Sequence, residues 1–422
     1  MNVHRVKHAW VVSDLHLGAG HGDILEDFHD DDLFADWVGE LAGGRDRSTL
    51  VLNGDIVDFL QIEVPPGDPL PDDYLWDEAT SVAKLRSCAE GHPAVFEALH
   101  GFVVAGGSLL VTVGNHDLDL AWPRVQAELH DLVGAADGAI GFGLQHRLFD
   151  TVHVEHGHRF TPENRPRDFD TFVHDWAANG SAPRQLLECP WGSRFVLDEI
   201  NPLERDVPYL DNVKPILKVA YHLLMGDALA GRRFRTILKL LGFLKRHGLP
   251  PKDVADMAIA ARDPLDGQAV HDAFGDDEHE WRSLVGQLRA DAPDEVDEAL
   301  ARLGPDDHAL LRDGKPVSLD EPLLGIFRSS REERAARHCL DDGDAQYVVF
   351  GHTHDVVDGE LGGRWFNPGS WIPHLDADAP DVANSGRPLL ELAADPDAFV
   401  ADRRAVHLTS TGDRVGLTLL DL

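Results

Sequence analysis

The sequence predicts an α/β protein whose sheet is interrupted by a mainly helical insertion. Short apolar runs typical of buried strands alternate with helical patterns up to about residue 160. The strand rhythm disappears over residues 161–339, where helical patterns replace it, and returns near residue 346. A chain of 422 residues also exceeds the usual size of one core. We therefore predict a core formed by residues 1–160 and 340–422, with the insertion, a lid or cap, over 161–339.

The first half of the core is predicted from alternating strands and helices. The apolar strands contain few charged residues, and one face of each helix is apolar, as in Phe34, Trp37 and Val38. This spacing favours right-handed crossovers between parallel strands. The predicted elements are strands at 9–13, 50–52 and 109–113, helices at 31–41, 93–105 and 122–133, and a surface loop at 64–73.

The remainder of the core is predicted from strands alone. A hairpin-like pair of short strands covers residues 146–149 and 152–155, and a buried strand begins at Tyr347. Further short strands after Arg364 close the sheet.

The insertion contains several helical patterns, of which Asp168–Ala178 is the first. Its segment Lys214–His247 holds eight Lys or Arg residues in an otherwise acidic chain. We favour a helix packed on its neighbours with a solvated basic face, because amphipathic helices usually face a core. The alternative is peripheral contact with an anionic membrane, or reception of an anionic substrate.

Composition limits the partners of the chain. The formal charge of −36 argues against a general nucleic-acid surface. Cys88, Cys189 and Cys339 are isolated, which favours buried thiols in a reducing compartment. The sequence shows neither a signal peptide nor an apolar run of 18 residues, so we expect a cytoplasmic protein.

Polar side chains follow five of the predicted strands at the point where each strand ends. The five segments read DLH, GDIVD, GNHD, HGH and GHTH. Ligands in open α/β sheets bind beyond the carboxyl ends of the strands, so we expect these side chains to meet at one edge. The candidate metal ligands are Asp14, His16, Asp55, Asn115, His156, His352 and His354.

The chemistry of this set predicts two metal ions. Carboxylate, imidazole and carboxamide groups suit Mn, Fe or Zn, and we expect Mn. Seven ligands are too many for one tetrahedral zinc but fit a pair of ions. Two ions about 3.5–4 Å apart activate a hydroxide and stabilise an in-line displacement at phosphorus.

Together, the five segments resemble the calcineurin-like metallophosphoesterase superfamily over residues 8–160 and 340–375. The resemblance implies a four-layer αββα sandwich with a dinuclear metal site. It implies that Asp14, His16 and His354 hold one metal, that Asn115, His156 and His352 hold the other, and that Asp55 bridges them. It further implies that His116 protonates the leaving oxygen or stabilises the transition state, and that Asp117 orients its imidazole. We expect Asp58 to orient ligands without binding metal.

Within that superfamily, SDLHLG and the long insertion resemble bacterial UDP-2,3-diacylglucosamine pyrophosphohydrolases in part. Those enzymes carry Arg in place of His116 and Asp in place of His158. The stretch RFTPENRPR follows the fourth segment, and its Arg159, Asn164 or Arg165 is a candidate phosphate clamp. The alternative is a basic loop that starts the insertion.

These observations predict metal-dependent hydrolysis of a phosphomonoester, phosphodiester or pyrophosphate on a phosphorylated small molecule or lipid. The first alternative is a nucleotide-lipid pyrophosphohydrolase at the membrane surface. The second is a non-catalytic scaffold that uses its metal site to bind a partner. A nuclease shares such motifs, but the acidic composition counts against nucleic acid as a partner.

Overall fold

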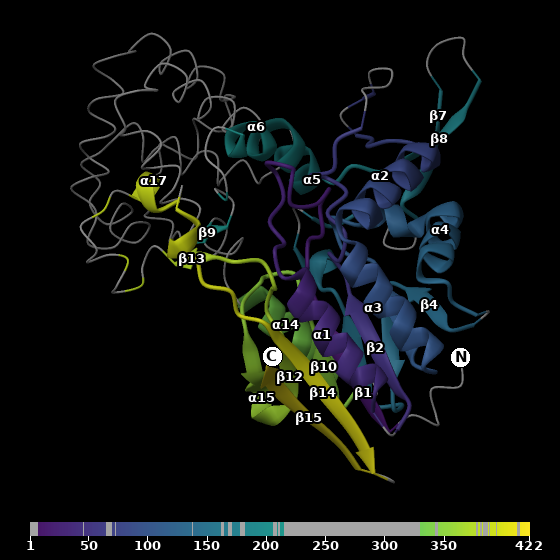
Figure 1. The fold of residues 1–422 in the computed structure, drawn as a ribbon, viewed down its shortest axis with the longest axis vertical. Coiled ribbons are helices and arrows are strands. Elements are labelled where there is room, and N and C mark those ends of the chain that lie inside the picture. The colour runs from purple at the N-terminus through teal and green to yellow at the C-terminus, as the bar shows by residue number, and fades with distance from the viewer. Residues whose placement is uncertain are drawn as a thin grey trace, which may run out of the picture. The chain divides into compact units, whose positions relative to one another are not determined.

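The computed structural model gives a mixed α/β fold with several sheets, as the sequence predicts (Figure 1). It describes residues 7–44, 46–64, 70–71, 73–136, 138–161, 164–167, 171–177, 182–205, 209, 212–214, 330–341, 345–376, 379, 382, 387, 389–393, 395–411 and 414–422. The chain divides into two compact units. The first comprises residues 1–212, 329–375 and 395–422, and it contains every candidate site residue.

The larger sheet of the first unit has six strands in the order β15-β14-β1-β2-β3-β4. β1 (His8–Val12), β2 (Ser48–Asn53), β3 (Ser108–Thr112) and β4 (Ile140–Gly143) are parallel. β14 (Arg404–Thr411) and β15 (Arg414–Asp421) extend the sheet as an antiparallel hairpin. The parallel arrangement brings the carboxyl ends of β1, β2 and β3 to one edge.

The second sheet has the order β11-β12-β10-β6-β5. Its strands are β5 (Gln145–Leu148), β6 (Val152–Glu155), β10 (Tyr347–Val349), β11 (Val357–Gly359) and β12 (Trp365–Asn367). β6 and β10 are parallel neighbours although 190 residues separate Glu155 from Ala345 in the numbering. This pairing places the HGH and GHTH segments side by side.

The two sheets share an apolar core. Val51 of β2 and Leu110 of β3 pack in one cluster with Val154 of β6 and Val349 of β10. The alternate residues of β2 and β3, such as Leu50 and Leu109, belong instead to the cluster under the helices. Successive residues of these strands point to opposite faces of the sheet, and both faces are buried. This explains why the strands read as continuous apolar runs.

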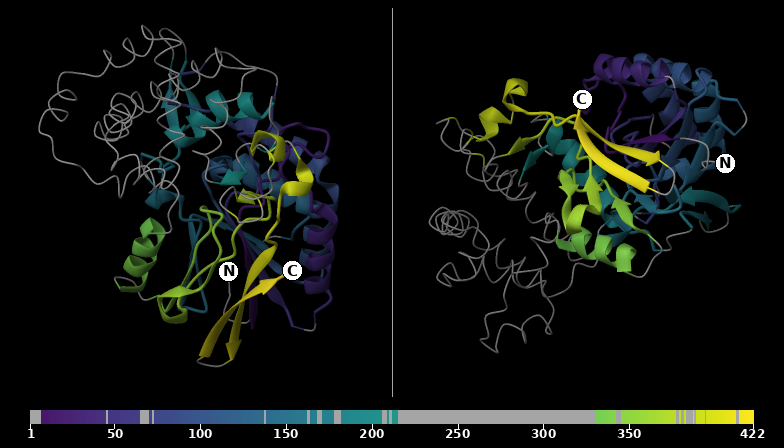
Figure 2. Two further views of the ribbon diagram at one scale, coloured as in Figure 1. Left: turned by 90° about the vertical axis from the view of Figure 1, so that its left-hand side faces the viewer. Right: turned by 90° about the horizontal axis from the view of Figure 1, so that it is seen from below.

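Helices cover the outer face of the larger sheet (Figures 1 and 2). They are α1 (Asp31–Ala42), α2 (Glu78–Gly91), α3 (Pro93–Val104) and α4 (Pro123–Val133). The predicted helix at 31–41 is confirmed with Phe34, Trp37 and Val38 buried. On the second sheet, α14 (Ser330–Asp341) packs Ala336 and Leu340 against Val348 and Trp365.

The described part of the predicted insertion is not uniformly helical. The helix predicted at Asp168–Ala178 is wrong, because Val173–Trp176 forms strand β7, which pairs with β8 (Arg184–Leu187). Phe172, which precedes β7, and Leu187 of β8 join the core of the first unit. Their burial favours a paired strand over a solvated helix. Short helical segments α5 (Trp191–Phe195), η4 (Val196–Ile200) and α6 (Asn201–Glu204) follow.

The basic segment Lys214–His247 lies outside the described residues apart from Lys214, which ends β9 (Val213–Lys214). The other short elements are η2 (Leu118–Ala121), η3 (His158–Phe160), β13 (Leu375–Asp376), α15 (Glu360–Gly363), α17 (Leu389–Leu392) and η7 (Pro396–Ala398).

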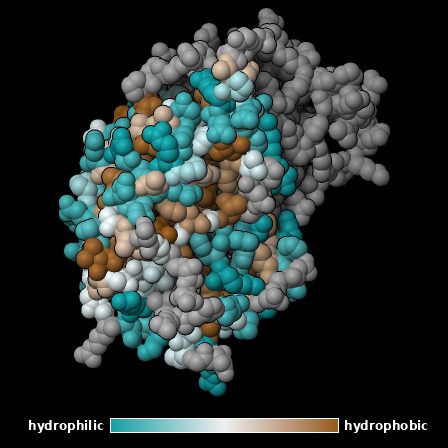
Figure 3. All heavy atoms as spheres, turned by 90° about the vertical axis from the view of Figure 1, so that its right-hand side faces the viewer, coloured by the Kyte–Doolittle hydropathy of each residue, from teal (hydrophilic) through white to brown (hydrophobic). Residues whose placement is uncertain are grey.

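Polar residues predominate on the face drawn in Figure 3, with apolar side chains between them. Among the described residues, no helix is both long and apolar enough to cross a bilayer.

All three cysteines are free; Cys88 and Cys189 are buried, as predicted, whereas Cys339 is half-buried.

Candidate metal centre

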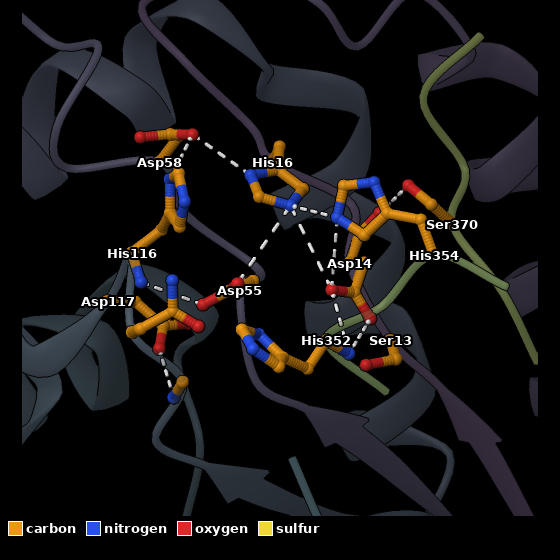
Figure 4. Close-up of polar contacts among 12 residues, drawn as sticks. Ser13, Asp14, His16, Asp55, Asp58, His116, Asp117, His352, His354 and Ser370 are labelled. Atoms are coloured by element: carbon orange, nitrogen blue, oxygen red, sulfur yellow. Dashed lines mark hydrogen bonds and ion pairs between the residues drawn. The ribbon is translucent and has the colours of Figure 1, made fainter. Parts of the chain in front are cut away.

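The seven candidate ligands come from the loops that follow β1, β2, β3, β6 and β10. Figure 4 shows Asp14, His16, Asp55, His352 and His354. Among these seven residues, two groups of side chains have ligand atoms within 4.8 Å of one another. The first is Asp14, His16 and His354, and the second is Asp55, His156 and His352. The structure therefore brings together residues that lie more than 300 positions apart in the chain.

Many of these residues adopt an unusual backbone conformation. The φ angle is positive at Asp14 (55°), His16 (53°), Asp55 (50°), His352 (74°) and His354 (59°). A left-handed conformation of a residue with a β-carbon is uncommon and costs roughly 1–3 kcal/mol. Such conformations gather at functional sites, where the surrounding structure holds them in place. Here they aim the side chains of three separate loops at one point.

The first group is compact, with Asp14 and His16 buried and His354 half-buried. His354 Nε2 lies 3.3 Å from Asp14 Oδ1 and 3.1 Å from His16 Nε2, and His16 Nε2 lies 3.9 Å from Asp14 Oδ1. The backbone N–H of His352 donates to the Asp14 carboxylate at 3.0–3.1 Å. Ser370 Oγ donates to the Asp14 backbone oxygen at 2.8 Å. Asp14 is thus held in place from both its side chain and its backbone.

The second group includes the carboxamide of Asn115. His156 Nε2 lies 3.0 Å from Asp55 Oδ2 and 3.3 Å from Asn115 Oδ1. The other ring nitrogen, His156 Nδ1, donates to the backbone oxygen of Asn53 at 2.9 Å. A hydrogen bond of this kind orients a histidine and leaves its second nitrogen available as a ligand.

Asp55 belongs to the second group and also approaches His16 of the first. Its Oδ2 is 3.0 Å from His156 Nε2 and 4.0 Å from His16 Nε2, while its Oδ1 accepts from the backbone N–H of His116 at 2.8 Å. Gly114 is required beside it, because a β-carbon there would lie 2.5 Å from the Asp55 nitrogen. This placement fits a carboxylate that bridges two cations.

Asp58 and His116 flank the first group. Asp58 Oδ2 accepts from His16 Nδ1 at 2.9 Å and from His116 Nδ1 at 2.7 Å. His16, Asp58 and His116 are also close enough together to hold an ion. Because Asp58 accepts from both Nδ1 atoms, however, the arrangement fits a carboxylate that orients two imidazoles.

The predicted role of Asp117 differs from its contacts in the structure. Its carboxylate accepts from the backbone N–H groups of Gly114 at 2.5 Å and Ile56 at 2.9 Å, so it braces the loops after β2 and β3. Asp58, not Asp117, holds the His116 ring. The sequence could not decide between the two carboxylates, because both lie close in number to a segment that reaches the site.

Mutual electrostatics dominate the ionisation of the centre. Burial alone would raise the pKa of Asp14, but His156 and His354 lower it to about 2. Burial alone would lower the pKa of His156, but Asp55 and Asp14 raise it to about 10. Burial and the neighbouring His156 lower the pKa of His352 to about 3. The buried carboxylates therefore depend on nearby positive charge. Protonated histidines supply that charge here, and a divalent cation supplies it equally well.

The candidate phosphate clamp is only partly directed at the centre. Arg159 pairs with the Glu155 carboxylate and lies over the Phe160 ring. Arg165 is exposed. Asn164 Nδ2, by contrast, lies 3.3 Å from His352 Nε2, and Thr161 Oγ1 lies 2.9 Å from the same atom. Thr161 was not predicted from the sequence, and its position between Arg159 and Asn164 is the signal that could have indicated it.

His158 is buried beside His156 and His352, with ring centroids 5.5 and 6.5 Å away. Within the described part of the chain, neither of its ring nitrogens has a hydrogen-bond partner. Burial, followed by the charge of His156, holds its pKa well below the usual range, so the ring is neutral.

The donor set, its geometry and its burial together are compatible with metal binding. Comparison with family models and with curated proteins gave no match to this chain.

Proposed function

We propose that this chain is a metal-dependent hydrolase of phosphate esters and a member of the calcineurin-like metallophosphoesterase superfamily, with the four-layer αββα fold. The observation that carries the proposal is the position of Asp55 Oδ2, which faces His156 at 3.0 Å and His16 at 4.0 Å. One carboxylate between two ligand groups is the arrangement that a dinuclear centre requires.

Two divalent cations are proposed, and Mn is the first candidate because the donors are oxygen and imidazole nitrogen. Asp14, His16 and His354 would hold one ion, and Asn115, His156 and His352 would hold the other, with Asp55 shared. When bound, such ions supply an acidified water as nucleophile and positive charge for the phosphoryl oxygens.

His116 is proposed to move the proton that the leaving group needs. Its Nδ1 donates to Asp58, so we assign the proton transfer to its other ring nitrogen, Nε2. The ring lies edge-on to His16 with centroids 4.7 Å apart, and its side chain is 19% exposed, so a substrate can reach it. Asp58 raises the basicity of this ring and fixes its tautomer.

Thr161 and Asn164 are proposed to orient the substrate at the other end of the centre. Both reach His352 Nε2 from the segment after η3. A hydroxyl and a carboxamide donate hydrogen bonds to phosphoryl oxygens without adding charge.

A direct test is the hydrolysis of a chromogenic phosphomonoester and of the matching diester, with Mn added or chelated. We expect Mn-dependent turnover of at least one ester, reduced at least about 100-fold in His116→Ala. The control His130→Ala changes a half-buried histidine on α4 and should leave turnover intact.

Diester preference would indicate a phosphodiesterase or pyrophosphohydrolase, and monoester preference a phosphatase. A protein that binds two Mn ions but hydrolyses neither ester nor any nucleotide or lipid diphosphate would refute the proposed activity and leave the scaffold alternative.

A further inference from the structure

The first turn of α14 carries a carboxyl group to the back of the metal centre. Glu332 is 1% exposed, although Glu333 beside it pairs with Arg337 on the helix surface. A glutamate is rarely buried unless it makes specific contacts. Glu332 therefore needs an explanation beyond helix formation.

One oxygen of Glu332 contacts the GHTH segment. Thr353 Oγ1 donates to Glu332 Oε2 at 3.1 Å, and Thr353 lies between His352 and His354 in the sequence. Asn367 of β12 reaches the same segment, because its Nδ2 donates to the Gly351 backbone oxygen at 2.9 Å. The loop with two candidate ligands is thus held by a carboxyl on one side and a carboxamide on the other.

The other oxygen of Glu332 faces the HGH segment. A β-carbon placed on Gly157 would lie 3.4 Å from Glu332 Oε1. Among the described residues, this oxygen has no hydrogen-bond partner. A single carboxyl group therefore binds the loop that carries His352 and His354 and lies beside the turn that follows His156.

The conformation of these loops explains why a brace is needed. His352 and His354 both have positive φ, at 74° and 59°. Strained backbone of this kind persists only where neighbouring groups determine its position. Burial raises the pKa of Glu332 to about 8, so the carboxyl group is uncharged at neutral pH.

We propose that Glu332 is a positioning residue of the metal centre, holding the Gly351–His354 loop against the His156–His158 turn so that their imidazoles converge. This inference rests on the proposed function only in requiring that the centre binds metal, not that it hydrolyses an ester.

The test compares Mn²⁺ affinity by calorimetry in the full-length protein and three variants, together with thermal midpoints. Glu332→Ala is expected to weaken Mn²⁺ binding about 10–100-fold, the usual effect of losing a group that orients ligands. Glu332→Gln keeps an acceptor for Thr353 and should stay within about threefold of wild type. Glu333→Ala, the neighbouring control, should bind like wild type.

Thr353→Val covers the case in which Glu332→Ala does not fold. It removes the hydroxyl that contacts Glu332 and keeps the side-chain shape, and it should weaken Mn²⁺ binding about tenfold. The proposal is overturned if Glu332→Ala, or Thr353→Val in its place, binds Mn²⁺ like wild type and only lowers the thermal midpoint. It is also overturned if Glu332→Gln fails to restore affinity.

The two proposals fail in different ways. Wild-type protein that binds Mn²⁺ without hydrolysing esters refutes the proposed function, while the ranking of these variants still decides the role of Glu332. Wild-type protein that binds no divalent cation refutes both.

Discussion

The carboxylate oxygen Asp58 Oδ2 lies 2.7 Å from His116 Nδ1. The same oxygen lies 2.9 Å from His16 Nδ1, so one carboxylate orients both an imidazole of the first ligand group and the candidate proton donor. His16 and His116 meet edge to face as a result. The proposed proton transfer and the proposed metal binding therefore depend on a common group.

Replacing Asp58 by Asn should reduce turnover without unfolding the protein. Asn carries no charge, and its NH₂ group must face either the two Nδ1–H groups or the backbone N–H groups of Leu60 and Gln61, which Asp58 Oδ1 now accepts. The His116 ring therefore loses its fixed tautomer and part of its basicity. We expect a loss of about 100-fold or more in kcat. The control is Asp131→Asn, which changes an exposed residue of α4 and should keep wild-type turnover. Full activity of Asp58→Asn would contradict the role of this carboxylate.

Two glycine substitutions should change different properties: Gly114→Ala should lower metal affinity, and Gly101→Ala should raise the free energy of unfolding. Gly114→Ala places a β-carbon against the Asp55 side chain and 2.5 Å from its nitrogen, so Asp55 must move and metal affinity should be lost. Gly101→Ala lies in α3 with open space around it and should raise the free energy of unfolding by about 0.5–1 kcal/mol. Calorimetric metal titration and urea unfolding measure the two effects. Unchanged metal binding in Gly114→Ala would contradict the position of Asp55.

Stability should fall at alkaline pH because of His92, which is not among the candidate ligands. Its buried ring contacts Glu26 Oε2 at 3.0 Å and Asp31 Oδ1 at 2.9 Å. Burial alone would lower the pKa of His92, but these two carboxylates raise it to about 9. Because the folded pKa exceeds the unfolded value, the stabilisation is complete below about pH 6.5 and is lost as pH rises through about 9.

The loss is expected to be at most roughly 3 kcal/mol. Urea unfolding of wild type and of His92→Gln across this pH range measures it. The variant should be less stable at low pH and should show a weaker dependence on pH. If the free energy of unfolding depends on pH in the same way in both proteins, His92 is not the cause of the alkaline loss of stability.

Divalent metal should stabilise the fold. The buried carboxylates and imidazoles of the centre converge on common points, and an ion bound only by the folded state adds its binding energy to stability. Metal at one hundred times its dissociation constant should add about 2.7 kcal/mol. The thermal midpoint should therefore fall on chelation in wild type, and much less in Asp55→Ala. An equal shift in both proteins would place the stabilising ion elsewhere.

Much of the core could be predicted because its strands have two buried faces and its helices have one. The run Leu109–Val113 and the helix around Phe34 and Trp37 each follow a period set by burial. The convergence of the five segments was also predictable, since parallel strands end at the same edge. In the structure, six of the candidate ligands form two groups, and Asn115 contacts His156 of the second.

Other features depend on contacts that a linear pattern does not contain. The strand at Val173–Trp176 has a helical pattern, yet it pairs with Arg184–Leu187 and joins the core. Asp58 and Asp117 are both carboxylates near candidate ligands, and only the path of the loops decides that Asp58 reaches His116. Glu332 follows a long stretch without strands, and its approach to Thr353 depends on the pairing of β6 with β10.

A titration of metal-free protein with Mn²⁺, in which bound metal and hydrolysis of the chromogenic esters are read on the same samples, decides whether this centre is a dinuclear phosphoesterase site. We predict no turnover without metal, two ions bound per chain at saturation, and turnover that rises with the second ion. Turnover that persists in chelator, or saturation with one ion at full activity, would contradict the dinuclear centre.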